Sequence, residues 1–194
     1  MRKLVKNIVY LIFYIIVFPT AMVVNCEKLF NKHSELWFSF FAQFWALAPG
    51  LPGCYLRAAF YSQVLDYCDK ECYLGFGMIC THREVKIEKN VYIGPYSMIG
   101  SSWIKESSLI GTRVSLLSGK NQHELGEDGK WTSFDPGKKI QIKVGPRAWL
   151  GEGVILMADV GETSLIGSGA VVSSNVPAGV VGAGNPFRVI RKAQ

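Results

Sequence analysis

An aliphatic residue recurs about every six positions between Ile87 and Pro186, and this period constrains the fold more than any other feature. A glycine usually follows the aliphatic residue, and a small or β-branched residue stands four places after it. The clearest units begin at Ile93, Ile110, Val144, Leu150 and Ile166. A period of six fits neither an amphipathic helix nor an alternating strand. It is typical of parallel β-helices, in which short strands stack coil upon coil. We therefore expect a mainly β fold with the aliphatic residues inside and glycines that permit the turn at each corner.

Three motifs in the last coils make the pattern more specific. Residues 144–153 resemble an "IGxxxWIGxG" coil, residues 166–172 an "IGAGSVV" segment, and residues 176–191 a "VPAG…GNPAKVI" closure. Together they resemble the hexapeptide-repeat acyltransferases over about the last two thirds of the chain. The resemblance implies a left-handed parallel β-helix, usually a homotrimer. It also implies transfer of an acyl group, most often acetyl, from coenzyme A to a hydroxyl or amine.

The repeat is interrupted once, between Gly119 and Ile140, by a polar interval at about 120–139. Solenoids accommodate insertions as loops, often on the binding face, so we expect an extruded loop here. His123 lies near its start, and the family resemblance implies that His123 is the general base. A base for this reaction needs a pKa near 7 and contact with the acceptor hydroxyl. Its orienting partner would be one of the nearby residues Glu124, Glu127, Asp128 and Asn121, of which we select Glu124, or a carboxylate from another coil or subunit.

His82 is the second candidate base, because it falls in an early coil. The chain has three histidines, so carbonic anhydrase activity is a further possibility. Such enzymes use the same repeat and hold zinc with three imidazoles. Only His82 and His123 fall in the repeat region, far apart in sequence, so we favour no metal site. The thioester of acetyl-coenzyme A is already activated, and the expected reaction requires no metal.

The family resemblance also implies a coenzyme A site at the last coils. Backbone groups of Gly167, Ser168 and Ala170 would contact the pantetheine arm, because small residues allow close approach. Arg188 and Arg191 would meet the phosphates. Trp149 matches the tryptophan of the family motif and would form a wall of the site or cap the core. Phe187 departs from the usual alanine of the closing motif, which puts the packing of adenine in doubt.

The N-terminal third has a different composition, with two uncharged apolar runs at Ile8–Val24 and Leu36–Leu51. Basic residues precede the first run, and Pro19 is expected to kink or end a helix there. We predict a membrane-associated helical hairpin or interfacial segment over residues 1–53. A short connecting helix (54–71) and the β-helix (72–194) would follow. A cleaved signal peptide and a hydrophobic cap packed on the β-helix are the alternatives.

A hairpin would keep both the basic N-terminus and the repeat domain in the cytoplasm, where acetyl-coenzyme A is found. Five irregularly spaced cysteines, expected to be reduced, agree with that compartment. The formal charge of +6 suits an anionic ligand or lipid surface, and the basic residues are too scattered to indicate nucleic-acid binding.

Membrane association favours a sugar or glycolipid acceptor near the bilayer. The alternatives are a serine O-acetyltransferase-like enzyme, a non-catalytic scaffold, or a transferase that takes its donor from a nucleotide sugar or an acyl carrier protein.

Overall fold

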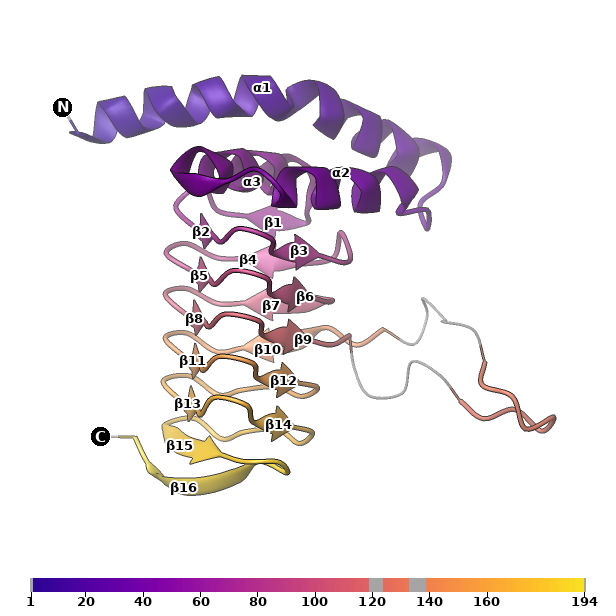
Figure 1. Cartoon of the computed structure of the whole chain (residues 1–194), viewed down its shortest axis with the longest axis vertical. Helices are drawn as coiled ribbons and strands as arrows, with labels where there is room; N and C mark the ends of the chain where they lie inside the picture. Colours follow the sequence, from indigo (N-terminus) through magenta and orange to yellow (C-terminus); the bar gives the residue numbers. More distant parts are fainter. Residues whose placement is uncertain (1, 119–123, 133–138, 194) are drawn as a thin grey trace.

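The computed structural model of the chain describes residues 2–118, 124–132 and 139–193, which form three N-terminal helices followed by short strands (Figure 1). The helices are α1 (Arg2–Phe30), α2 (Leu36–Ala46) and α3 (Gly50–Val64). The first nine strands are β1 (Tyr67–Cys68), β2 (Tyr73–Leu74), β3 (Ile79–Cys80), β4 (Lys86–Ile87), β5 (Tyr92–Ile93), β6 (Met98–Ile99), β7 (Ser102–Ile104), β8 (Leu109–Ile110) and β9 (Ser115–Leu116). The remaining strands are β10 (Ile142–Val144), β11 (Trp149–Leu150), β12 (Ile155–Leu156), β13 (Leu165–Ile166), β14 (Val171–Val172), β15 (Val180–Ala183) and β16 (Arg188–Lys192).

The strands form three sheets in which strands of successive coils pair in parallel, three strands apart up to β12 and two apart beyond it. The first sheet has the order β1-β4-β7-β10, the second β2-β5-β8-β11-β13-β15-β16, and the third β3-β6-β9-β12-β14. Only β16 runs antiparallel among the described strands, and it closes the end of the stack against β15. This is a solenoid of about 6 turns, and the left-handed parallel β-helix predicted from the repeat is confirmed.

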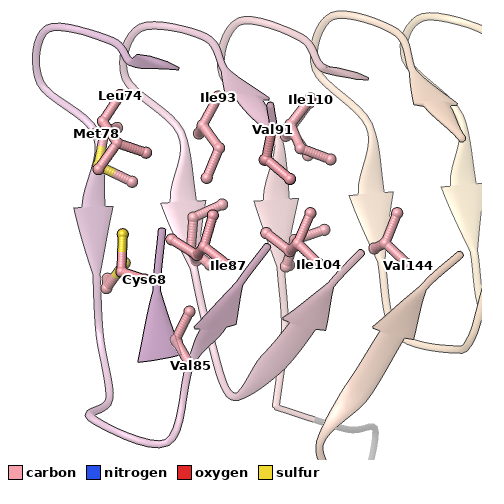
Figure 2. Close-up of a cluster of buried hydrophobic side chains, with 14 of the residues drawn as sticks. Cys68, Leu74, Met78, Val85, Ile87, Val91, Ile93, Ile104, Ile110 and Val144 are labelled. Carbon is pink, nitrogen blue, oxygen red and sulfur yellow. The ribbon is translucent and has the colours of Figure 1, made fainter. Parts of the chain in front are cut away.

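The aliphatic residue of each repeat lies inside the β-helix. Ile93, Ile110, Leu150 and Ile166 have exposed fractions of 0%, and the small residues four places later are equally buried. Figure 2 shows Ile93 and Ile110 inside the β-helix, beside buried side chains of neighbouring coils such as Ile87 and Ile104. Because each coil alone has too little surface to form a core, burial comes from stacking on its neighbours.

The repeat glycines have a different role from the one predicted. They do not adopt the left-handed conformation; the residue two places later does, as at Tyr96 and Arg113 (φ 58° and 56°). The glycine is required because the coils stack closely. A Cβ at Gly94 would lie 2.6 Å from the carbonyl carbon of Gly111, and one at Gly151 would lie 2.6 Å from the amide nitrogen of Ser168. Close stacking, rather than the turn, therefore selects glycine at these corners.

The helices cover the first coil and form a layer that we call the helical cap (residues 2–64; Figure 1). Helix α1 continues through Pro19 to Phe30, so the proline does not end the helix, because a proline removes one helical hydrogen bond and the packed neighbours support the rest. Helix α3 starts at Gly50, before the predicted Cys54, because Pro52 falls in the first turn, where no intrahelical N–H bond is needed. It ends at Val64, and the β-helix begins at Tyr67 rather than Cys72.

Arg57 of α3 joins the cap to the first coil. The side chain is fully buried, and its guanidinium donates to the carbonyl oxygens of Leu74 (2.9 Å), Ala48 (2.7 Å), Trp45 (3.2 Å) and Ala46 (3.3 Å). Three of these acceptors belong to the C-terminal end of α2, where unpaired carbonyls and the helix dipole favour a cation. A single buried cation thus fixes α2, α3 and coil one relative to one another.

Within the described residues, the segment Lys6–Phe30 of α1 is long and apolar enough to cross a membrane. Length and composition alone also fit a signal sequence or a helix buried in a soluble protein, so the packing of α1 has to be considered.

Candidate active site

The interrupting loop leaves the β-helix at one corner, which we call the loop corner. Its described residues are those of the turns that join the third sheet to the first, at 81–85, 100–101, 117–118, 139–141 and 157–159. Figure 1 shows residues 124–132, which lie between β9 and β10 in the chain, away from the stack. The extruded loop predicted at about 120–139 lies partly outside the described residues, and its bounds stay a prediction. Its far part is a small hairpin in which Leu125 and Trp131 form an antiparallel bridge.

His123, the predicted general base, lies outside the described residues. Glu124, its candidate partner, is exposed at the base of the hairpin. Its amide donates to the Thr132 hydroxyl (2.9 Å), and its carbonyl accepts from the Thr132 amide (2.8 Å). The structure thus places Glu124 in the loop predicted to carry the chemistry, and its pairing with His123 stays a prediction.

The returning strand of the loop is fixed to an earlier turn of the same corner. Lys139 Nζ lies 2.6 Å from Glu84 Oε2, and the side-chain amide of Gln141 donates to the Glu84 carbonyl oxygen (2.8 Å). The Lys139 side chain is only 12% exposed, so this pair is better shielded than a typical surface ion pair. These contacts tie the root of the loop to the turn that carries His82.

His82 pairs with a carboxylate that the sequence analysis did not select. Its Nδ1 lies 2.7 Å from Oε2 of Glu35, at the start of α2, and both side chains are largely shielded (15% and 25% exposed). Burial acts to raise the pKa of Glu35, but the bond to His82, the Arg83 amide and the positive charge of Lys139 together lower it. The carboxylate therefore orients the imidazole. The two residues are 47 positions apart, so no local sequence pattern indicates that they pair.

The neighbouring Arg83 secures the same turn to the cap. Its guanidinium forms a buried ion pair with Glu27 of α1 and donates to the Ser34 carbonyl oxygen (2.7 Å). Burial acts to raise the pKa of Glu27, but hydrogen bonds from Ser34, Trp37 and Phe38 and the charge of Arg83 outweigh it, so the pKa is lowered. The His82–Glu35 hydrogen bond and the Arg83–Glu27 ion pair thus hold the helical cap at the loop corner.

The residues predicted to bind coenzyme A lie on another corner, which joins the second sheet to the third. Ser168 is exposed there, and the Gly167 amide donates to the Gly182 carbonyl oxygen (2.7 Å). Ala170 is fully buried, with its amide bonded to Gly167 and its carbonyl oxygen to the Ile155 amide. Ala170 is therefore a core residue, and Ser168 is the accessible member of this segment.

The remaining predicted residues are accessible. Trp149 points outward from β11 and is 51% exposed, which makes it a surface wall rather than a cap on the core. Arg188 and Arg191 lie on the exposed closing strand β16, where their guanidinium groups bond the carbonyl oxygens of Phe187 (3.0 Å) and Lys192 (3.1 Å). Both cations face solvent at the end of the β-helix opposite the cap (Figure 1).

Within one chain, the predicted catalytic residues and the predicted coenzyme A residues thus lie apart. The described roots of the loop predicted to carry the base and the His82–Glu35 pair lie at the corner between the third and first sheets, whereas Ser168 lies at the corner between the second and third. In a three-sided prism the core fills the space between two corners, so they face different directions.

Comparisons with known proteins agree with the fold. No family model matches the chain. A galactoside O-acetyltransferase from Escherichia coli (strain K12) is 39% identical over 93 residues, which cover 46% of this chain and 43% of that protein. The match thus spans less than half the length of this curated relative.

Two solved structures share the architecture. A maltose O-acetyltransferase from Clostridium difficile 630 superposes with a TM-score of 0.63 and 18% identity, covering 81% of this chain and 85% of its own. A galactoside acetyltransferase in complex with coenzyme A superposes with a TM-score of 0.60 and 21% identity, and the match covers 87% of this chain and 84% of that one. The repeat, the β-helix and these relatives agree with the resemblance to hexapeptide-repeat acetyltransferases that the motifs carry, and the two structures show that the fold is shared.

Proposed function

We propose that the chain is an acetyl-coenzyme A-dependent O-acetyltransferase that acts on a sugar or glycolipid near a membrane, with His123 as general base. The observation that carries the proposal is the match to a galactoside O-acetyltransferase over 93 residues, together with the interruption of the repeat that carries His123. A related structure contains coenzyme A, which supports the donor. Because this donor is cytosolic, we place the β-helix on the cytoplasmic side.

The reaction needs few groups. The imidazole of His123 takes the proton from the acceptor hydroxyl while the oxygen attacks the thioester carbonyl carbon. The carbon–sulfur bond then breaks, and the protonated imidazole returns the proton to the thiolate of coenzyme A. Ser168, Trp149 and the arginines of β16 would hold the donor, because exposed cations favour its phosphates.

The separation of the two corners supports a homotrimer. In such an assembly the loop corner of one protomer would face the donor-binding corner of the next. Outward side chains on the second sheet would line the contact, including Tyr92, Leu109 and Trp149, which are 38–51% exposed. Three prisms around an axis would give three equivalent sites, each completed by two chains.

His82 is the second candidate base, favoured by the Glu35 carboxylate 2.7 Å away. An imidazole oriented by a carboxylate is the usual arrangement for a catalytic base. His82 also shares the loop corner with the root of the loop. The same pair would equally fix α2 to the first coil, so activity measurements have to separate the two roles.

The test is transfer of radiolabelled acetyl from acetyl-coenzyme A, with the full-length protein in lipid vesicles. Galactosides, maltose, serine and a membrane glycolipid extract serve as acceptors. We expect label in a hydroxylamine-sensitive ester on a sugar or glycolipid and none on serine. If the protein binds no coenzyme A by calorimetry, the chain is a scaffold or uses another donor, and the proposal fails.

Two histidine variants then assign the base. We expect His123→Ala to lower kcat by about 10²- to 10⁴-fold, with coenzyme A affinity little changed. His33→Ala, in the exposed link between α1 and α2, is the matched control and should retain activity. A larger loss of kcat in His82→Ala than in His123→Ala, with an unchanged melting temperature, would transfer the role to His82.

A further inference from the structure

The outward face of α1 is almost entirely apolar. Its exposed side chains recur every three or four residues and so share one side of the helix. They are Ile8, Leu11, Ile12, Ile15, Ile16, Phe18, Met22 and Val23, each 41–62% exposed. An exposed apolar surface of this extent usually marks a docking site for protein or membrane.

The opposite face of α1 is packed along its length onto α3. The Tyr10 and Ser62 hydroxyls are 2.7 Å apart, and the Phe13 ring stacks on Tyr55 with centroids 5.6 Å apart. Further along, the Asn25 amide donates to the Gln63 carbonyl oxygen (3.2 Å). Helix α1 is therefore part of the folded domain. Crossing a bilayer would pull it off α3 and break these contacts.

Helix α2 extends the same apolar surface. Leu36, Phe40, Phe44 and Leu47 are 53–71% exposed. A groove of about 680 Å³ lies between the two helices, lined by Met22, Val23, Phe30, Leu36 and Trp37 among others. The groove joins the outer face of α1 to α2 and is wide enough to accept part of an acyl chain.

Charges at the edge of this surface suit a lipid headgroup layer. Lys28 and Lys32 are exposed beside its C-terminal end, and Lys6 is exposed at its N-terminal end. Glu27, the one acidic residue of α1, is turned inward to Arg83. An apolar face bordered by lysines is typical of helices that lie in the membrane interface, where anionic lipids attract the cations.

We propose that the helical cap is a monotopic membrane-docking face, with α1 lying flat in the bilayer interface and the β-helix standing away from it. The 29 residues of α1 give a length of about 44 Å. Figure 1 shows α1 lying across the end of the stack, so the β-helix axis would point along the membrane normal.

The first experiment is flotation of the full-length protein with preformed vesicles of phosphatidylcholine, with and without phosphatidylglycerol. We expect binding to both, tighter with the anionic lipid. Ile12→Glu combined with Ile16→Glu should weaken binding at least tenfold. Val189→Glu combined with Ile190→Glu is the control, because it charges exposed apolar residues at the opposite end of the β-helix and should leave flotation unchanged.

A sidedness experiment separates a flat helix from a spanning one. The free thiol of Cys26 lies near the C-terminal end of α1, and Lys6→Cys supplies one near the other end. With an impermeant maleimide, a flat helix leaves both ends reactive from outside, whereas a spanning helix hides one until detergent is added. Protection of one end would overturn the proposal.

Self-association is the remaining outcome. Wild type would then fail to float with vesicles. In sedimentation it would form a species twice the size of the one formed by the Ile12→Glu/Ile16→Glu variant. That result would show that the face binds a second copy, and the proposal would be wrong. Transfer of acetyl to a soluble sugar reports separately on the proposed function. It should persist in this variant whether or not the vesicles bind.

Discussion

The β-helix and the helical cap bury their contacts in different ways. In the β-helix each coil repeats the same few contacts, with an aliphatic residue on the axis and a glycine against the next coil. The cap depends on two buried arginines, Arg57 and Arg83, that each connect segments far apart in sequence. The stability of the β-helix is therefore distributed over many equivalent contacts between coils, whereas the stability of the cap depends on a few unique polar contacts.

The largest expected effect is on the coil stack, with Gly161→Val. A Cβ at Gly161 would lie 2.3 Å from the amide nitrogen of Ala178, so two coils would have to separate. We expect a loss of more than about 4 kcal/mol in the free energy of unfolding, or no folded protein. Urea unfolding followed by circular dichroism measures it.

Gly153→Asn is the matched control for this change. Gly153 has φ 69° and nothing within 4 Å of a Cβ, and Asn90 already adopts the same conformation at another corner. Asparagine tolerates this conformation, so stability should change little. Equal losses in the two variants would show that the turn, rather than close stacking, requires glycine.

The next effect is on the cap, with Arg57→Met. The change deprives the carbonyl oxygens of Leu74 and Ala48 of a charged donor in a buried setting. We expect a loss of about 3 kcal/mol, with faster proteolysis within residues 2–64 than in the β-helix. Arg147→Met, at a half-exposed arginine, is the control. If proteolysis were equal across the chain, the cap and the β-helix would unfold as one unit.

A smaller effect on the stability of the cap is expected when the pH is lowered. The folded pKa values of Glu27 and Glu35 are lowered from 4.5, so their ionised forms stabilise the cap above that pH. This stabilisation falls as the pH drops below 4.5 and through the lower folded pKa values. Hydrogen exchange should therefore show α1 and α2 opening in acid before the coil stack.

Glu27→Gln tests the source of this acid sensitivity. The variant should be less stable than wild type near neutral pH, with a weaker dependence of cap exchange on acid. An unchanged pH profile would assign the sensitivity to other carboxylates.

The smallest effect is expected at the surface pair Arg113–Glu152. Its nitrogen and oxygen are 2.6 Å apart, but the side chains are 69% and 53% exposed. Arg113→Ala should therefore lower the free energy of unfolding by less than about 1 kcal/mol. A loss comparable with that of Arg57→Met would mean that this corner is buried in an assembly, and sedimentation of wild type and variant would show it.

The sequence by itself determined the β-helix, its aliphatic core and the position of the loop, because a periodic fold imposes a periodic pattern. It also predicted the apolar N-terminal runs, but left open whether Pro19 kinks or ends the helix, and α1 continues through it. The role predicted for the repeat glycines was wrong, because the sequence of one coil does not show how closely the next coil approaches it.

Only the tertiary structure decided how the regions meet. The pairs His82–Glu35 and Arg83–Glu27 join residues 47 and 56 positions apart, and no local pattern links them. The placement of Ser168 and the loop on different corners also depends on how coils close in space. Spacing along the chain specifies which residues repeat, whereas contacts between unique residues follow from packing.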